Sequence, residues 1–403
     1  METPSMIGYI QDQGRALKAT FENRAVYCDP FCQIFQERDI RKIYLLGSGT
    51  SYNAATAIKQ YLEMYLPVEA EVMIPTVFTN HAKINRNCIY NQDEILVVGI
   101  SQSGTSVSTI EAMKKAKQEG YYTVAVTEAT ESLITREVDR VVKLTCGKEE
   151  IPVETRGYSV TLLQGYLTAL EVAHSRKKLD DTDFKLRITR TAEFLEHYPE
   201  IMEQTEKWYL ANQKELLNMR KSCVAAYGLN YCTAIEAELK LFETFKHPVR
   251  GYEMEEMIHG PQMAFDEDTY VFLVASEEKE LERVPRFIQF FEENHITEHV
   301  FVITANEMKL KEKDLCFYAP IPAELSPLVF TLPFQIMAAR NCIAVGIDTA
   351  KRPKNRKTKK FSKKSVQKLG RKHFINRRFD RREGRASFIR KRKRNERKGE
   401  IFQ

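Results

Sequence analysis

The sequence lacks the segments that direct a chain into a membrane or out of the cell. No run approaches the roughly 20 uninterrupted apolar residues of a membrane-spanning helix. The first residues, METPSMIGYIQDQGRALKATFEN, hold no basic stretch followed by an apolar one, so they indicate no secretory signal. We therefore expect a cytoplasmic protein that has no membrane partner.

Cysteines are few, and they are scattered. The eight cysteines show neither the spacing of a disulfide framework nor that of a zinc site. Only Cys28 and Cys32 lie close together, and no cluster of His or Cys accompanies them, so metal binding by this pair is the weaker alternative. We expect reduced, mostly buried thiols, and we expect neither a metal nor another cofactor.

Acidic residues are scarce at the C-terminal end. Residues 351–403 contain 24 Lys and Arg but only four acids, which leaves 37 basic and 51 acidic residues in 1–350. The net charge of +6 therefore conceals an acidic body and a basic tail. Because the tail is poor in apolar residues, we expect it to be partly disordered. It either binds nucleic acid or another polyanion through its charge, or it is a solvated or non-native end; the second interpretation is favoured.

A length of 403 residues, 43% of them apolar, allows two buried cores. Short apolar runs alternate with segments of helical period, which is typical of parallel sheets covered by helices on both faces. We predict an α/β fold with two doubly wound domains, residues 1–200 and 201–350, followed by the tail at 351–403. The predicted strands are 43–46, 95–100, 122–127 and 141–144, and then 223–227, 270–275, 300–304 and 315–318.

Two loops rich in glycine and hydroxyl groups follow neighbouring strands of the first domain. Their sequences are Gly-Ser-Gly-Thr-Ser-Tyr at 47–52 and Ser-Gln-Ser-Gly-Thr-Ser at 101–106. Glycine lets the backbone approach an anion, which N–H groups and hydroxyls at a helix start can bind. Neither loop has the Gly-Lys-Ser/Thr of a triphosphate loop or the third glycine of a dinucleotide loop. One such loop would be an ordinary helix cap, but two indicate a site for a sugar monophosphate.

In the second domain, Lys240 and Glu243 lie in a helix-period segment, and His259 follows after a loop. Aldose–ketose interconversion needs one group to open the sugar ring and another to carry a proton between C1 and C2. A histidine suits the first task and a partly desolvated carboxylate the second. In isolation each residue is more often a solvated charge or a loop histidine. The remaining ionisable groups nearby are interpreted as solvated or supporting groups: His247, Glu253, Glu255 and Glu256.

The motifs GSGTSYNAA, ISQSGTS, L-K-x-x-E and an H-G-P sixteen positions after that Glu resemble the sugar isomerase (SIS) family. The likeness is greatest to the isomerase half of glucosamine-6-phosphate synthases, over about residues 25–368. It implies flavodoxin-like domains, a phosphosugar substrate and a homodimer with shared active sites. It also implies a substrate-binding set of Gly49, Thr50, Ser51, Ser101, Gln102, Ser103 and Ser106.

The same resemblance assigns roles to the candidate catalytic residues. Glu243 corresponds to the base that shuttles the proton, and Lys240 lies beside the sugar carbonyl. His259 corresponds to the ring-opening histidine, which in the family comes from the partner subunit. Lys364, in the segment K-K-S-V-Q, corresponds to a lysine that can form a Schiff base with the open-chain ketose.

The sequence departs from the synthases in two places. Where they carry V-A-S-T-K, residues 153–157 read V-E-T-R-G, so Thr155 keeps a hydroxyl and Glu154 adds a carboxylate near C1 and C2 of the sugar. This carboxylate would favour a cationic group such as an amine, unless it pairs with Arg156 or Arg136 instead. No glutaminase segment precedes residue 25, so we expect no transfer of nitrogen from glutamine.

We therefore expect a phosphosugar isomerase, deaminase or deglycase that acts on an amino-sugar or fructosamine-type hexose 6-phosphate. The reaction would pass through an enediol or an enolamine. The alternative is a non-catalytic sugar-phosphate sensor that regulates a partner or a nucleic acid. The presence of both Glu243 and His259 favours the enzyme, because a sensor needs neither.

Overall fold

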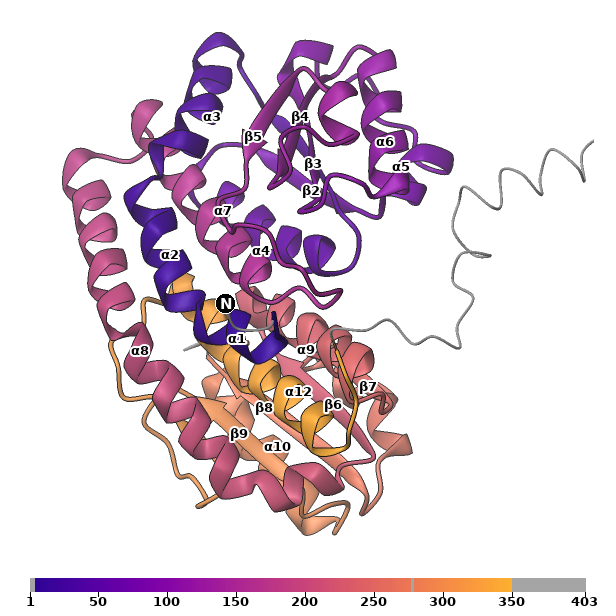
Figure 1. Ribbon diagram of the computed structural model, residues 1–403, viewed down its shortest axis with the longest axis vertical. Coiled ribbons are helices and arrows are strands. Elements are labelled where there is room, and N and C mark those ends of the chain that lie inside the picture. Colours follow the sequence, from indigo (N-terminus) through magenta and orange to yellow (C-terminus); the bar gives the residue numbers. More distant parts are fainter. Residues whose placement is uncertain (1–3, 277–278, 350–403) are drawn as a thin grey trace, which may run out of the picture. The chain divides into compact units, whose positions relative to one another are not determined.

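The computed structural model describes residues 4–276 and 279–349 (Figure 1). The predicted basic tail and Lys364 lie outside the described residues. Within them, no helix has both the length and the apolar character that crossing a membrane requires. All eight cysteines are free thiols, and most of them are buried.

The described strands form two five-stranded parallel sheets. The first sheet has the order β2-β1-β3-β4-β5, and the second has the order β10-β9-β8-β6-β7. Read from its other edge, the second sheet repeats the order of the first, so the predicted α/β architecture of two parallel sheets is confirmed. The strands are β1 (Lys42–Leu46), β2 (Glu69–Met73), β3 (Ile95–Ile100), β4 (Tyr122–Thr127), β5 (Arg140–Lys143), β6 (Lys221–Ala226), β7 (Val249–Glu253), β8 (Thr269–Ala275), β9 (Val300–Thr304) and β10 (Leu315–Cys316).

Helices cover both faces of each sheet (Figure 1). In the first half they are α1 (Met6–Gln11), α2 (Gln13–Glu22), α3 (Ala25–Glu37), α4 (Thr50–Tyr65), α5 (Pro75–Asn80), α6 (Val107–Gln118) and α7 (Arg156–Ser175). In the second half they are α8 (Asp181–Asn218), α9 (Tyr231–Thr244), α10 (Val284–Glu293), α11 (Ser326–Phe330) and α12 (Leu332–Ala344).

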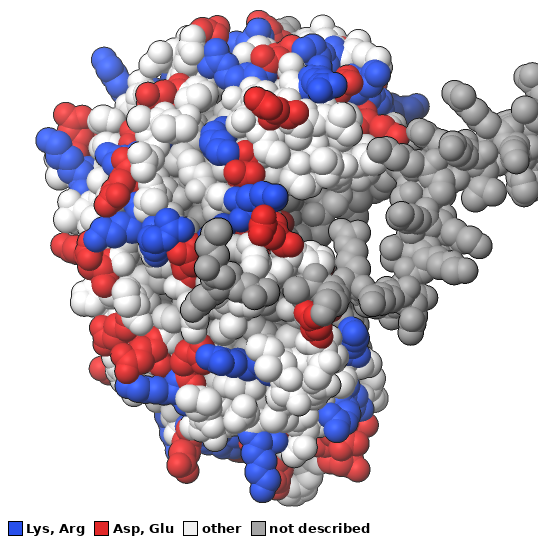
Figure 2. All heavy atoms as spheres, in the orientation of Figure 1, with Lys and Arg blue, Asp and Glu red and all other residues white. Residues whose placement is uncertain are grey.

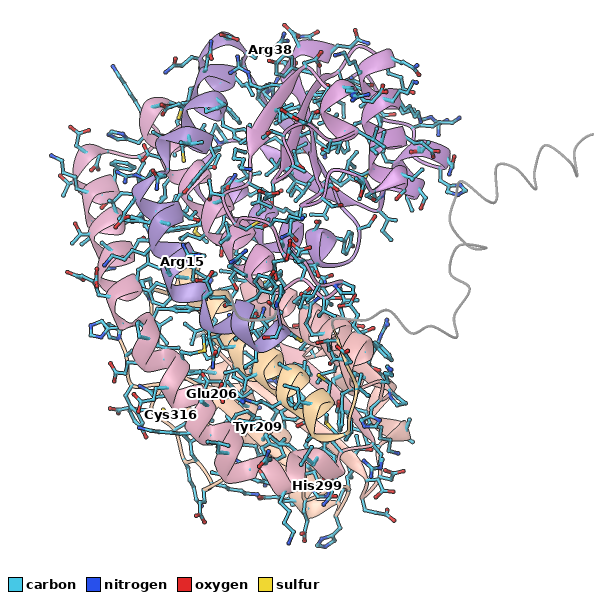
Figure 3. All side chains as sticks on the ribbon, in the orientation of Figure 1. Arg15, Arg38, Glu206, Tyr209, His299 and Cys316 are labelled. Atoms are coloured by element: carbon cyan, nitrogen blue, oxygen red, sulfur yellow. The ribbon has the colours of Figure 1, made fainter. Side chains whose placement is uncertain are left out.

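The long helix α8 crosses the predicted domain boundary at residue 200, so the exact division of the chain stays a prediction. Figure 3 labels Glu206 and Tyr209 on this helix. Glu206 accepts a hydrogen bond from Arg340 of α12 at 2.9 Å, and the Tyr209 hydroxyl donates to Asn341 at 2.8 Å. These bonds fix α8 against the last helix of the second half.

Side chains of β1 alternate between two cores, as the pleat of a strand requires. Ile43 and Leu45 face the core shared with α3, α4 and α7, whereas Tyr44 and Leu46 face the core under α5 and α6. The first of these cores continues into the second sheet, where it includes Phe272 of β8. One hydrophobic core therefore lies between the two sheets and joins the two halves.

Strands β2 and β7 were not predicted, and both are sheet edges. Their sequences, EAEVM and VRGYE, carry charges on a half-exposed edge, so they lack the continuous apolar run of a central strand. Figure 2 shows acidic and basic side chains interspersed on the visible face, with no single-sign patch dominating it.

Edge strand β7 lies against α9, and Gly251 allows this close approach. A Cβ atom at Gly251 would lie 2.5 Å from the carbonyl oxygen of Ala234, which belongs to the α9 backbone. Backbone atoms cannot move aside as a flexible side chain can, so any larger residue must push β7 away from α9.

We predict that Gly251→Ala lowers the free energy of unfolding by about 2 kcal/mol, because its new methyl group overlaps the α9 backbone. Chemical denaturation measures this change. The control is Gly14→Ala in α2, whose Cβ would lie 3.4 Å from the Tyr198 ring and whose helix propensity improves by about 1 kcal/mol. Equal stabilities of the two variants would contradict the packing argument.

Candidate functional site

The two predicted anion loops follow β1 and β3, which are neighbours in the first sheet. After β1 the chain continues to β2 on one side of the sheet, and after β3 it continues to β4 on the other side. Ligands of doubly wound sheets bind where the connections diverge in this way. Gly49 and Gly104 both have φ of +60°. A Cβ at Gly104 would also lie only 1.8 Å from the Ser132 hydroxyl, so this loop conformation requires glycine.

The second loop presents polar groups that its own helix does not use. Ser106 stands at the N-cap of α6, but its side chain caps no backbone N–H. Within the described residues, the backbone N–H groups of Gln102 and Ser103 donate no hydrogen bond. The exposed Ser103 hydroxyl contacts only that of Thr105, at 2.9 Å, and its backbone N–H at 3.4 Å. These backbone N–H groups are therefore available to an anion, as are hydroxyls that do not cap the helix.

The first loop is tied to the second half of the chain. Thr50 donates its hydroxyl to Glu236 of α9 at 3.1 Å, and Asn53 donates its amide to the same carboxylate at 2.7 Å. Thr50, which is predicted to lie beside the phosphate, therefore also links α4 to α9. Ser51, in the first turn of α4, and Ser101, directly after β3, are both buried.

One face of α9 carries Glu236, Lys240 and Glu243, at helical spacings of four and three residues. The Lys240 ammonium lies 3.4 Å from Glu236 and donates to Glu243 at 2.8 Å. Lys240 is only 1% exposed, whereas Glu243 is 36% exposed. Burial alone would lower the pKa of Lys240, but the carboxylates of Glu236 and Glu243 raise it above its usual value. Lys240 is thus a fixed positive charge and not a free amine.

Sequence reasoning missed Glu236, which is fully buried. Burial raises the pKa of Glu236, while Lys240 and the hydrogen bonds from Asn53 and Thr50 act in the opposite direction. Its position four residues before Lys240 was the available signal, because a carboxylate and a lysine at that spacing meet on one helix face. Its partners on α4 could not be read from the sequence.

Glu149 was also missed, and it caps the start of α7. Its carboxylate accepts the backbone N–H of Gly157 at 2.7 Å and that of Thr155 at 3.1 Å. It also accepts the Gln102 amide at 3.2 Å and the Thr155 hydroxyl at 3.3 Å. Glu149 therefore holds Gln102, a predicted phosphate ligand, and Thr155, a predicted sugar ligand, against one helix N-terminus.

Glu154 lies beside Gly157, where a Cβ would come within 2.6 Å of its carboxylate oxygen. Within the described residues it forms no hydrogen bond and no ion pair. Burial and the nearby Glu149 raise the pKa of Glu154 to about 8, against the opposing effect of Lys240. Arg156 instead forms its ion pair with Asp12, at 2.6 Å. Glu154 consequently has no direct ion-pair partner among the described residues.

His259 is exposed at the end of the 3₁₀ helix η4 (Glu256–Ile258). Neither a hydrogen bond nor an ion pair joins it to Glu243 in the part of the chain that the structure describes. The other polar residues of this loop serve local structure. Glu255 forms a bidentate pair with Arg283 at 2.6 and 2.9 Å, and Glu253 accepts the N–H groups of Glu255 and Glu256.

The remaining loop histidine, His247, lies with its ring centroid 3.9 Å from that of Phe245, in an edge-to-face arrangement. Burial lowers the pKa of His247, so its neutral form is favoured. Its contacts point to packing at the end of α9 rather than to proton transfer.

Known proteins share this sequence over most of its length. The chain is 27% identical over 365 residues to a glutamine–fructose-6-phosphate aminotransferase (isomerizing) of Caldanaerobacter subterraneus, which covers 87% of this chain and 57% of that protein. The corresponding protein of Clostridium tetani is 26% identical, with the same coverage. The chain therefore spans a little over half the length of these curated relatives.

Solved structures share the fold. A protein of Clostridium difficile 630, provisionally named a phosphosugar isomerase, superposes with a TM-score of 0.80 at 24% identity, covering 89% of this chain and 99% of that one. The C-terminal domain of glucosamine-fructose-6-phosphate aminotransferase from Francisella tularensis gives 0.75 at 22% identity, covering 87% and 98%.

The family model described as SIS domain matches residues 38–172, a range that contains β1 to β5 and both anion loops. This range also includes Glu149 and Glu154 at the start of α7. Residues 38–172 thus form a SIS domain, and the resemblance to the sugar isomerase family that the two loops indicated is confirmed.

Proposed function

We propose that this chain is an enzyme that moves a proton between C1 and C2 of an amino-sugar or fructosamine-type hexose 6-phosphate. The observation that carries the proposal is the pair of hydrogen bonds from Thr50 and Asn53 to Glu236. They bring the first anion loop next to the helix on which Lys240 and Glu243 lie. A phosphate at the loops and a reactive carbon near Glu243 can then belong to one sugar.

The 6-phosphate would bind at the second loop and at the buried end of the first. Its oxygens are expected to accept the free N–H groups of Gln102 and Ser103 and the hydroxyls of the surrounding residues, namely Ser51, Ser101 and Ser106. No lysine or arginine is needed for a singly phosphorylated sugar, since two helix N-termini and several hydroxyls face the anion.

Glu243 is the proposed base, because it is the most exposed member of the α9 charge cluster and can reach a ligand. Lys240 donates to it and holds its carboxylate in place. As the proton leaves carbon, negative charge develops on the neighbouring oxygen, and the fixed ammonium of Lys240 stabilises it. Isomerisation, deamination and deglycation all begin with this step.

His259 is the proposed ring-opening group, supplied by a second subunit of a homodimer. Its imidazole is exposed and makes no hydrogen bond within the described residues, as expected for a side chain that works outside its own subunit. Glu255, whose pKa is lowered mainly by Arg283, lies close enough to His259 to interact with it electrostatically.

The charges around the site favour a substrate that carries nitrogen. Three carboxylates surround Lys240 and Glu154: those of Glu149, Glu236 and Glu243. One ammonium does not balance them, so an amine or ammonium on the sugar would be attracted. This favours deamination or deglycation over simple isomerisation.

Replacing Glu243 by Gln should lower kcat at least about 10³-fold, because the amide cannot accept the proton from carbon. The assay follows free amine from fructosamine 6-phosphates and ammonia from glucosamine 6-phosphate. Glu193→Gln on the exposed face of α8 removes the same charge elsewhere and should keep full activity. If the wild-type protein binds these sugars but turns none of them over, the enzyme proposal fails and the sensor alternative is correct.

Replacing Ser103 by Ala should weaken the binding of a hexose 6-phosphate about tenfold, since one hydrogen bond to a charged group contributes about 1.5 kcal/mol. Titration calorimetry with glucose 6-phosphate measures this loss. Ser175→Ala at the end of α7, whose hydroxyl donates to the Val172 carbonyl and lies beside the Cys32 thiol, serves as the control. Unchanged affinity of the Ser103 variant would place the phosphate elsewhere.

A further inference from the structure

Two carboxylates at the start of α7 lie in opposite environments. Glu149 accepts two backbone N–H groups of the helix start and the Gln102 amide, at 2.7 to 3.2 Å. Such donors stabilise the ionised form of a carboxyl group. Glu154 accepts no hydrogen bond within the described residues, although its oxygen lies against Gly157 in the same turn. The two side chains are therefore chemically distinct despite their proximity.

The groups that face Glu154 make a further negative charge there unfavourable. They come from its own loop and from α9, and they are Cys146, Glu149, Glu236, Glu243 and Lys240. Three of them are carboxyl groups, and burial raises the pKa of the Cys146 thiol, so it stays neutral. Only Lys240 is cationic, and it is already engaged by Glu236 and Glu243.

We propose that Glu149, which is held by hydrogen bonds at the start of α7, keeps Glu154 protonated, so that Glu154 donates a proton to the substrate nitrogen. Glu154 is then a catalytic acid, and Glu149 is a positioning residue. The proposal rests on the proposed function, because it requires a substrate that carries nitrogen. It also differs from the role that the sequence suggested for Glu154. Glu154 acts as a proton donor and not as a fixed anion that attracts an amine.

The steps balance for a fructosamine 6-phosphate. Glu243 takes a proton from C1 and returns it to C2, while the C2 oxygen gains a proton and the substrate nitrogen loses its own, which converts the aminoketose into an imine at C1 with a hydroxyl at C2. Water adds to this imine and forms a carbinolamine. The C1–N bond then breaks with its electron pair moving to nitrogen, Glu154 gives its proton to that nitrogen, and the C1 hydroxyl loses its proton to Glu243. The products are a free amine and an aldose 6-phosphate; Glu154 regains its proton from solvent, and Glu243 releases its proton to solvent.

The raised pKa of Glu154, about 8, supports this assignment because it leaves the acid protonated at neutral pH. Acid and base roles are thus divided between two carboxyl groups in one site. Here Glu243 provides the base on α9, and Glu154 provides the acid from the loop that precedes α7.

The first test needs no turnover. NMR of the protein with ¹³C-labelled glutamate carboxyl groups follows the titration of Glu154, whose signal is assigned by its loss in Glu154→Gln. We expect a midpoint near pH 8 in the wild-type protein. In Glu149→Gln the midpoint should fall by about one pH unit, because a neighbouring negative charge is lost. Glu150→Gln, which removes an exposed charge one residue away, should leave it unchanged.

A Glu154 midpoint below pH 6 in the wild-type protein, or one that does not move in Glu149→Gln, overturns the pairing. Because Glu149 also caps α7, circular dichroism must show that Glu149→Gln is folded. If it does not fold, the pairing is judged by Glu149→Asp, in which a retained charge must keep the midpoint above pH 7.

The second test compares leaving groups. In Glu154→Gln, release of an alkylamine from its fructosamine 6-phosphate should fall about 100-fold, because a poor leaving group depends on general-acid catalysis. Release of an arylamine, a better leaving group, should fall less than about tenfold, and C1 deuterium exchange in D₂O should persist. Equal losses for both amines, or loss of the exchange, overturn the assignment of Glu154 as the acid.

The exchange also separates this proposal from the proposed function. If the wild-type protein exchanges no C1 proton on any phosphosugar, the proposed function fails and Glu154 has no nitrogen to protonate. If exchange occurs in the wild-type protein and in Glu154→Gln but both leaving groups behave alike, only the role of Glu154 fails.

Discussion

The charge of Lys240 is buried between the two halves of the chain, and the geometry of the site depends on its compensation. A lone ammonium at this depth would cost several kcal/mol in lost hydration. Glu236 and Glu243 compensate it, and Glu236 is in turn held by Thr50 and Asn53 of α4. Such a cluster adds little net stability, but it accepts only one alignment of α4 with α9. The first anion loop, which leads directly into α4, takes its position from that alignment.

The same cluster separates the chemical roles of its members. Glu236 is sealed from solvent and serves only Lys240 and the α4 residues, whereas Glu243 reaches the surface at the end of the same helical face. Because Lys240 is held as an ammonium by two carboxylates, it can stabilise negative charge but cannot act as a nucleophile. One helix therefore supplies both an electrostatic anchor and an accessible base.

Much of the fold could be predicted because buried parallel strands appear in the sequence as apolar runs, as 95–100 and 300–304 do. Edge strands such as EAEVM carry too many charges to give that signal. The two anion loops could be predicted because closely spaced glycine and hydroxyl residues indicate an anion site without knowledge of distant contacts. Glu236 and Glu149 were missed because their roles depend on partners that are distant in the sequence. Glu236 binds Thr50, 186 residues away, and Glu149 binds Gln102, 47 residues away. For Glu236 the only local signal is its spacing of four residues from Lys240, which solvated ion pairs on a helix share.

The hydrophobic core that continues from the first sheet into the second has a consequence for how the chain can evolve. Each half repeats the same strand order, yet neither could be released as an independent unit, because separation would expose Phe272 and its neighbours to water. Because neither half has to be stable alone, the two halves can differ in their chemical groups while they keep the same strand order. The first half carries the anion loops and the second carries the helix of Lys240 and Glu243, and the shared core keeps both in one folding unit.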